Sequence, residues 1–579
     1  MLEPVHRVER EFVLAWRLAA VVGFVLCVCA FWQLAEQYEL FLLPQQGVTF
    51  VPERELAFYA YYAVFGSLAF ACALRAFAGL AVWPRVAASC AELALRPRPL
   101  VWVISLLMFG ASLAFRRLVL EGQPIADDEA TYLFIARTLL SGRLVNPLPP
   151  EAEFFHNQFL VFSQHGWYGK YPIGHPLWLA LGELLHVTDL MMPLSAALCV
   201  PLCYGIGRRL FAADGALFGC ALLLLSPHFV WTAGTLLSQP TCCLLLLLGV
   251  WCALRAEESG RASWAWFAGA AFGFGTVVRP LPGGLFAVVA LIWAVAEVWR
   301  LRASLRARSQ LRAGCVRALA MAVPIVAGGV VILLVNYVQT GDPLSSGYHE
   351  ATVQHHVVLF ANGHADIAHS VFGALVRENV WLFGVPGGLL LCLFARPQRH
   401  VGLLWGLCVA ELAYRLISPK TVVATTGPIY LTEIVPLLVL LAADGLLRLC
   451  AVVSERWRTW LQPLPLVAAA ILVASCLFVP VQWRTVRRAV AVRALVFRAL
   501  DQAQATRALV FSDALVNPTS GYSWAYFPDN PTPDLSDRVL FVRVPRSDTL
   551  RSATAFWQRH FADRRAFFYL WDAHGEPSF

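Results

Sequence analysis

The sequence predicts an α-helical polytopic membrane protein that carries a small α/β domain at its C-terminal end. Hydrophobic residues make up 59% of the 579 residues, and the mean hydropathy is +0.62. Roughly thirteen apolar stretches approach the ~20 residues that a spanning helix needs. A chain of this composition cannot fold as one soluble domain.

The expected spans follow one another from residue 12 to residue 482. They cover 12–35, 56–83, 100–120, 189–211, 216–235, 238–254, 263–279, 281–299, 318–338, 379–395, 401–417, 431–449 and 465–482. Each is apolar along most of its length, as the hydrocarbon core of a bilayer requires.

Basic residues indicate how these spans are oriented. They crowd into short loops, above all between Arg302 and Arg317, and these loops fall on one side of the bilayer by parity. Short basic loops stay cytoplasmic, so we expect the N-terminus inside and residues 121–188, 339–378 and 484–579 outside. The net charge of +8 is then loop charge and not a nucleic-acid surface. The first apolar segment is too long for a cleavable signal peptide and lacks a cleavage site.

The fifteen cysteines are expected to be small apolar fillers. Most lie inside apolar stretches, and none follows Cys476. The Cys242-Cys243 pair and the Cys27-x-Cys29 spacing lack the further His or Cys pair of a structural zinc site. Buried thiols of this kind pack as small hydrophobic groups.

Residues 484–579 differ in character from the rest of the chain. Residues 508–511 and 539–542 are short apolar runs typical of buried strands, and 549–562 has the periodicity of an amphipathic helix. We therefore expect a small α/β domain here. It has no glycine-rich phosphate loop and no Ser/His/Asp arrangement, so packing or docking is expected of it and not catalysis.

Three consecutive acids, Asp127, Asp128 and Glu129, follow the span 100–120 in a chain with only 14% charged residues. A carboxylate can cap the helix expected from residue 130, where it satisfies free N–H groups and matches the helix dipole. Capping explains one acid or two. Three mutually repelling acids at a membrane surface are costly unless they have partners, which favours a chemical role such as a general base.

A second set of candidates lies in residues 167–176 of the same loop. Lys170 stands between aromatic residues and prolines, and His175 begins a stretch, 175–186, that is too short to span and is expected to lie in the membrane interface. An interfacial lysine usually extends its ammonium to the headgroups. The aromatic surroundings favour a phosphate contact instead, which a compact positive charge serves well.

Two further candidate positions lie at the ends of spans. Arg279 ends an apolar helix, where an arginine needs either an ion-pair partner or a bound anion, and the sequence supports both equally. Residues 425–436 contain the glycine and prolines that interrupt the entry into span 431–449. This places Tyr430 and Glu433 near the same surface.

These pieces, in this order and on one side of the membrane, resemble the GT-C superfamily of integral membrane glycosyltransferases. The resemblance is greatest to the bacterial branch akin to protein O-mannosyltransferases and lipid A aminoarabinose transferases, and it covers residues 100–450. The shared motifs are Asp128-Glu129-x-x-Tyr132 with Ala136-Arg137, Lys170-Tyr171-Pro172, Gly341-Asp342-Pro343-Leu344, and Gly427-Pro428-x-Tyr430 with Glu433-x-x-Pro436. Two features depart from the family: Ile429 stands where relatives often have Arg, and the two spans before residue 100 are additional.

The resemblance implies three parts: an extra N-terminal transmembrane pair over 1–99, a GT-C-like catalytic core over 100–483, and a periplasmic α/β domain over 484–579. It implies an enzyme of the bacterial inner membrane that moves a sugar from a polyprenyl-phosphate donor to a lipid, glycan or protein acceptor at the periplasmic face. Transfer in a single displacement would invert the anomeric centre. The superfamily has metal-dependent and metal-independent members, and no histidine spacing here decides whether a divalent metal takes part.

The resemblance also implies roles for single residues. Asp128 would be the general base, with Glu129 as the reserve and Asp127 as an orienting or capping group. The groups that meet the donor phosphate would be Lys170, Arg279 and His175. The substrate contacts would come from Tyr132, Arg137, Tyr171, Tyr430 and Glu433.

Two other classes of protein share some of these features. A lipid or glycan transporter or flippase also needs many spans, but it would carry charged residues near mid-helix and discontinuous helices in both halves. The expected spans are mostly apolar at their centres. A non-catalytic scaffold would use its tail as a binding module, and substitutions in the acidic loop would then be silent.

Overall fold

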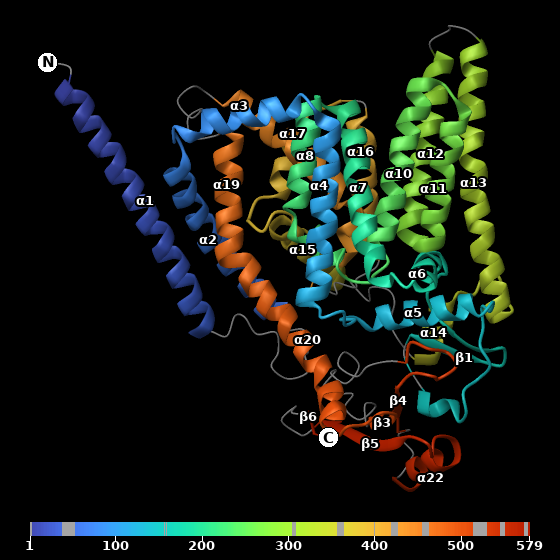
Figure 1. The fold of residues 1–579 in the computed structure, drawn as a ribbon. Helices are drawn as coiled ribbons and strands as arrows, with labels where there is room; N and C mark the ends of the chain where they lie inside the picture. The colour runs from blue at the N-terminus through green and yellow to red at the C-terminus, as the bar shows by residue number, and fades with distance from the viewer. Residues whose placement is uncertain are drawn as a thin grey trace.

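Figure 1 shows the computed structural model of the chain. The structure describes residues 3–37, 52–155, 157, 159–303, 308–355, 364–398, 400–417, 426–453, 462–512, 530–544, 550–571 and 577–578. Within these residues, nine helices are long and apolar enough to cross a membrane, and three shorter apolar helices accompany them. The predicted class, an α-helical polytopic membrane protein with a small α/β domain, is confirmed.

The long helices stand side by side in one bundle (Figure 1). They are α1 (Glu3–Gln37), α2 (Pro52–Phe77), α4 (Pro97–Ala114), α7 (Thr188–Leu210), α10 (Gln239–Ser259), α12 (Pro280–Ala303), α13 (Arg308–Thr340), α17 (Val435–Val452) and the consecutive α19 (Pro463–Val473) and α20 (Val479–Gln502). The shorter ones are α8 (Ala213–Leu224), α11 (Ala262–Val278) and α16 (Val401–Ile417). A helix satisfies its own backbone groups, which a segment crossing hydrocarbon must do.

The helices differ in how much of their apolar surface the protein itself covers. In α17, 72% of the apolar window is buried, whereas the share is 6% in α1 and 17% in α13. α17 therefore lies inside the bundle, and α1 and α13 lie at its edges, as Figure 1 shows. Apolar surface exposed along whole helices is suited to contact with lipid and not with water.

The expected count of roughly thirteen spans is not confirmed. Residues 379–395 form no continuous helix, because α15 (His364–Trp381) ends in a turn and the 3-10 helix η3 (Leu389–Phe394) follows. Gly384 in this turn has a φ of 70°, and a Cβ there would lie 2.8 Å from the Cβ of Ala474, so the position requires glycine. Hydropathy concealed the break, since the segment is as apolar as a span, although Gly384, Pro386, Gly387 and Gly388 are residues that interrupt helices.

Helix α2 packs against this broken segment. The Tyr62 hydroxyl of α2 donates to the Gly384 carbonyl at 2.7 Å, and the Trp381 indole donates to the Tyr59 hydroxyl at 2.8 Å. Tyr59, Tyr62 and Trp381 are buried. Backbone groups that leave helical pairing among spanning helices need partners of this kind.

One end of the bundle carries the segments that hold the predicted site. They are α5 (Asp127–Leu140), α6 (Gly174–Leu184), α14 (Gly347–His355) and an antiparallel hairpin of β1 (Leu160–Ser163) and β2 (Gly166–Gly169). We call this end the α5 end. The short helix α3 (Val82–Ala94) lies across the opposite end (Figure 1).

The C-terminal domain lies beyond the α5 end (Figure 1). Its sheet has the order β4-β3-β5-β6, in which β3 (Ala508–Ser512) runs parallel to β4 (Val539–Arg543) and β5 (Arg565–Trp571), and β6 (Pro577–Ser578) is antiparallel to β5. α22 (Leu550–His560) packs on it. The two predicted strands and the predicted helix are confirmed. The expected boundary at residue 484 falls inside α20, which continues to Gln502.

The C-terminal domain shares a hydrophobic core with the loop between α5 and α6. Phe154 stacks on Phe556 of α22 with ring centroids 4.0 Å apart. Glu151 lies 2.9 Å from His560 Nε2. The domain is therefore packed against the α5 end and not merely tethered to it.

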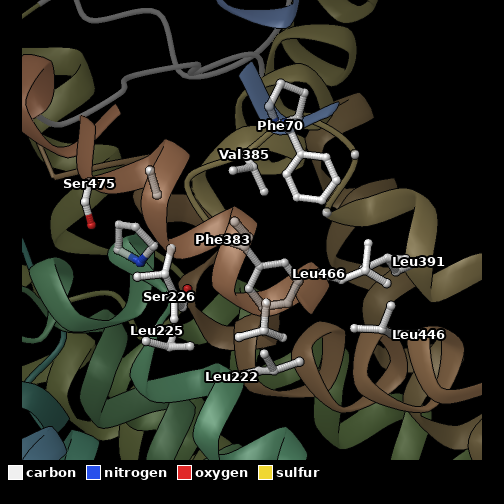
Figure 2. Close-up of a pocket in the computed structure, with 18 of the residues that line it drawn as sticks. Phe70, Leu222, Leu225, Ser226, Phe383, Val385, Leu391, Leu446, Leu466 and Ser475 are labelled. Atoms are coloured by element: carbon white, nitrogen blue, oxygen red, sulfur yellow. The ribbon is translucent and has the colours of Figure 1, made fainter. Parts of the chain in front are cut away.

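An apolar cavity of about 420 Å³ lies among α2, α8, α17 and α19 (Figure 2). Phe70, Leu222, Leu446 and Leu466 are among the residues that line it. None of the predicted site residues belongs to its lining. The candidate chemistry therefore has to be sought at the α5 end.

Candidate active site

Helix α5 begins at the acidic triplet, and Glu129 caps it. Ala126 has the extended backbone of an N-cap but offers no side-chain acceptor. Glu129 accepts hydrogen bonds from the Ile125 and Ala126 N–H groups at 2.9 and 3.1 Å, which is one half of a capping box. Its second oxygen accepts from the Leu236 N–H at 2.8 Å. Glu129 thus joins the start of α5 to the loop before α10.

The surroundings of Glu129 suit a structural role. Its side chain is completely buried, and Arg116 lies 3.7 Å away. Burial raises the pKa of this carboxyl above its ordinary value, although Arg116 and the three amides act in the opposite direction. An acid with both oxygens engaged and no access to solvent is better placed to hold α5 than to serve as a reserve base. The side chain of Asp127 lies outside the described part of the structure.

Asp128 is half-buried and points toward Tyr171, whose hydroxyl donates to Oδ1 of the carboxylate. Burial, together with the charge of Asp128, raises the pKa of the Tyr171 hydroxyl well above its ordinary value, so this group remains a donor. A carboxylate fixed by one donor retains lone pairs for a further proton. Asp128 therefore has the geometry that a general base needs.

The hairpin of β1 and β2 presents Lys170 and Tyr171. Leu160 pairs with Gly169, and the Lys170 N–H extends the ladder by donating to the Phe159 carbonyl at 2.9 Å. The Lys170 ammonium lies 4.1 Å from the centroid of the Phe159 ring, 5.2 Å from that of Tyr171 and 5.8 Å from that of Tyr348. Cation–π attraction of this kind positions an ammonium without neutralising its charge.

A line of polar contacts connects Tyr132 of α5 with Arg279 at the end of α11. The Tyr132 hydroxyl lies 3.1 Å from Ser238 Oγ, to which Arg279 donates at 3.0 Å. Arg279 Nε lies 2.7 Å from the buried carboxylate of Glu433. Of the two interpretations that the sequence allowed, the ion pair is therefore present. Because a guanidinium has five donors, this pair leaves capacity for an anion as well.

Two tyrosines border the same space. The Arg279 guanidinium lies 5.9 Å from the Tyr430 ring, and Tyr348 packs edge-on against Tyr171 with centroids 5.4 Å apart. Burial raises the pKa of the Tyr348 hydroxyl well above its ordinary value, and the charges of Arg279 and Asp128 act on it in opposite directions. Tyr348 is therefore near enough to both the acid and the guanidinium to sense their charges.

Sequence reasoning missed Tyr348 and Ser238 as members of this cluster. The signal for Tyr348 was the turn at 341–344, which leads directly into α14. The signal for Ser238 was its position just before Pro240, where α10 begins next to a polar loop. Neither residue belongs to a run of charged side chains, and only the fold brings them to Tyr132 and Arg279.

His175 lies behind Tyr132 and not among the phosphate-binding candidates. Its ring packs edge-on against the Tyr132 ring at 4.7 Å, with Nδ1 3.0 Å from Thr241 Oγ1 and Nε2 2.8 Å from the Leu236 carbonyl. Burial lowers the pKa of His175 to about 4, so the ring is neutral near pH 7. A neutral ring with both nitrogens engaged brings no charge to a phosphate. Its geometry is that of a support for Tyr132.

Arg137 lies toward the other end of α5, ~13 Å from Asp128 by the rise of an α-helix. Its guanidinium donates to Glu183 of α6 at 2.9 Å and to Thr532 of the C-terminal domain at 2.7 Å. Asp537 is 3.8 Å away. Arg137 therefore connects α5 to α6 and to the C-terminal domain, and the structure does not bring it to Asp128.

No group of three or more His, Cys, Asp or Glu side chains that could hold a metal ion occurs in the part of the chain that the structure describes.

The site thus unites a half-buried carboxylate, an ammonium held by three rings and a guanidinium at one end of a membrane bundle. Residues 177–327 match the model of the dolichyl-phosphate-mannose-protein mannosyltransferase family. The chain resembles GT-C membrane glycosyltransferases. The resemblance predicted from the motifs is confirmed by this match. The matched segment of this GT-C-like chain contains Ser238 and Arg279, whereas Asp128 and Lys170 precede it.

The solved structures that match this GT-C-like chain share little sequence with it. ArnT from Cupriavidus metallidurans, bound to undecaprenyl phosphate, is 15% identical over 81% of this chain and 89% of that chain, with a TM-score of 0.49. Arabinosyltransferase EmbB from Mycobacterium smegmatis is 14% identical over 68% of this chain and 34% of that chain, with a TM-score of 0.36. The Archaeoglobus fulgidus oligosaccharyltransferase is 10% identical over 75% of this chain and 65% of that chain, with a TM-score of 0.37. No curated protein sequence matches the chain.

Proposed function

We propose that this GT-C-like protein transfers a sugar from a polyprenyl-phosphate donor to a hydroxyl of a lipid, glycan or protein acceptor at the periplasmic face of a bacterial inner membrane. The observation that carries this function is the cluster that links Asp128 through Tyr171 and Tyr132 to Arg279, with Lys170 beside it. One acid and two cations fit a reaction in which a hydroxyl loses a proton while a phosphate departs. The family that matches residues 177–327 is named for dolichyl-phosphate-mannose, which supports a polyprenyl-phosphate donor.

In the proposed reaction, Asp128 accepts the proton of the acceptor hydroxyl as the hydroxyl oxygen attacks the anomeric carbon. The bond between the anomeric carbon and the phosphate oxygen breaks, and the polyprenyl phosphate leaves with the electron pair. This single displacement inverts the anomeric centre. The hydrogen bond from Tyr171 keeps the base oriented toward the acceptor.

Lys170 and Arg279 stabilise the negative charge that develops on the departing phosphate. Charges fixed in a site that excludes most water act more strongly than the same charges in solution. Glu433 holds Arg279 by its ion pair. Tyr132, Tyr348 and Tyr430 offer aromatic faces and hydroxyls between the acid and the cations, where the sugar would lie.

Deletion of the gene is expected to make the donor lipid accumulate. Mass spectrometry of extracted lipids and glycans should show a polyprenyl-linked sugar at a raised level and an envelope lipid, glycan or protein that lacks one sugar. Expression of the wild-type chain in the deletion strain should reverse both changes, and expression of the Asp128→Asn variant should reverse neither. Identical lipid and glycan profiles in the deletion and parent strains would contradict the proposed function.

We further propose that the α5 end and the C-terminal domain lie outside the cytoplasm. The basic residues Arg302, Arg312 and Arg317 adjoin the connection between α12 and α13 at the opposite end of the bundle, and basic connections of this kind remain cytoplasmic (Figure 1). A reporter enzyme that works only in the periplasm should therefore be active when fused after Phe579. A reporter that works only in the cytoplasm should be silent there. The reverse result would place Asp128 on the cytoplasmic side and contradict the proposed location.

A further inference from the structure

A buried polar cluster that the proposed mechanism does not use lies against η4 (Ile429–Ile434), the 3-10 helix that carries Tyr430 and Glu433. Its members are His228 in α9 (Pro227–Thr232), Glu378 in α15 and Thr432 in η4. All three side chains are completely buried. Ionisable groups buried among spanning helices are costly and persist only with partners.

The hydrogen bonds of this cluster fix the proton on one nitrogen of His228. The Thr432 hydroxyl donates to the Ile429 carbonyl at 2.8 Å. A hydroxyl has a single hydrogen, so Thr432 can only accept from His228 Nε2, which lies 3.0 Å from its oxygen. Nε2 therefore carries a hydrogen, and His228 donates to η4.

The other ring nitrogen binds Glu378. His228 Nδ1 lies 2.8 Å from Glu378 Oε2, and both side chains have no exposed surface. Among the described residues, His228 is the one polar partner of the Glu378 carboxylate. Glu378 therefore fixes the orientation of the His228 ring.

The chain that enters η4 is packed directly on the same ring. A Cβ on Gly427 would lie 3.0 Å from the Trp381 ring and 3.3 Å from the His228 ring. The φ of Gly427 is 121°, which side chains rarely adopt. His228 thus contacts η4 both through the Thr432 hydroxyl and through the backbone before it.

We propose that Glu378 and His228 are positioning residues for the donor site. Through Thr432 they fix η4, and η4 fixes Glu433, the residue that follows Thr432. Glu433 in turn holds the Arg279 guanidinium at 2.7 Å, where it meets the donor phosphate. The effect on η4 rests on the contacts described above, and the effect on the donor rests in addition on the proposed function.

Hydrogen exchange at the amides of residues 429–434 tests the first step. His228→Asn and Thr432→Val should raise the exchange rate of this segment, on the order of 10-fold, because each removes the hydrogen bond to η4. Thr432→Ser keeps the hydroxyl and should leave the rate unchanged. Asp444→Ala is a matched control, since Asp444 is buried in α17 and accepts from the Arg396 N–H at 2.8 Å without contact to η4. Unchanged exchange in Thr432→Val would overturn the inference.

Binding of undecaprenyl phosphate to the purified full chain tests the second step. We expect Kd to rise on the order of 10-fold in His228→Asn and Thr432→Val. The double variant should be no weaker than the weaker single one, because both changes remove the same contact. A merely structural role would lower the fraction of folded protein and leave Kd unchanged, and that result would overturn a role in positioning. If the wild-type chain fails to bind while exchange in η4 responds as expected, the proposed function is contradicted. The inference that His228 and Glu378 fix η4 through Thr432 is then still supported.

A further variant keeps the test decisive if His228→Asn does not fold. His228→Phe combined with Glu378→Met removes both ionisable groups together, and such joint replacements often preserve stability. Thr432 then loses its donor while the space stays filled. This double variant should show the same faster exchange and the same rise in Kd as Thr432→Val. Wild-type values for both quantities in a folded double variant would contradict the inference.

Discussion

Replacing Asp128 with Asn is expected to lower the rate of sugar transfer by ~10²-fold or more. The amide oxygen can still accept the hydrogen bond from Tyr171, so the shape of the site is kept. The amide cannot take a proton from an acceptor hydroxyl, and the base is lost. Transfer rates of purified wild-type and variant protein at saturating donor, together with their amounts in the membrane, would measure the effect.

Glu129→Gln is the matched control for this experiment. It changes the neighbouring acid of the same triplet, but it acts on the hydrogen bonds to Ile125, Ala126 and Leu236. We expect a lower Tm, because an amide nitrogen would face a backbone N–H, and a transfer rate per folded molecule within a few-fold of wild type. Asp128→Asn activity close to wild type would remove Asp128 from the role of base and return it to Glu129 or Asp127.

Replacing Lys170 with Ala is expected to lower kcat/KM for the donor by about 10- to 100-fold, the range of a charge-assisted hydrogen bond. Lys170→Met should have the same effect, because it keeps an unbranched side chain of similar length and removes the charge. Lys170→Arg should retain part of the activity. Donor saturation curves at fixed acceptor would separate these variants.

The control for Lys170 is an exposed cation at the same end of the bundle. Arg487 lies 2.5 Å from Glu121, and both side chains are more than one-third exposed. Arg487→Ala should leave the donor curve unchanged, since an exposed ion pair contributes little. Identical donor curves for wild type, Lys170→Ala and Lys170→Met would show that Lys170 serves only as a contact to headgroups.

Much of the fold could be predicted from the sequence because spans and helix starts depend on local composition. An apolar stretch of ~20 residues has few alternatives to a spanning helix. The acidic triplet marked the start of α5 for the same reason, since free N–H groups attract carboxylates whatever the tertiary structure. The order and sidedness of the motifs also predicted that Asp128, Tyr132, Tyr171 and Arg279 belong to one site. The structure connects these four residues by contacts.

The remaining features depend on what lies across from a residue, and the chain alone does not reveal that. Asp128 and Glu129 are neighbours in sequence, yet their partners differ. Glu129 contacts Leu236 and Arg116, whereas Asp128 contacts Tyr171. Arg137 carries the same charge as Arg279, but its partners lie on α6 and in the C-terminal domain. The pairing of His228 with Glu378, 150 positions apart, leaves no periodic trace.

The turn at Gly384 changes how α1 and α2, the two long helices before residue 97, are to be understood. By sequence they are an addition to a core that could stand without them. In the structure, two tyrosines of α2 bind this segment. The Tyr62 hydroxyl donates to the Gly384 carbonyl, and the Tyr59 hydroxyl accepts from the Trp381 indole. These hydrogen bonds give partners to polar groups at a break among the spanning helices, where hydrocarbon would offer none. A shortened form of this protein therefore has to include α2 to keep these partners.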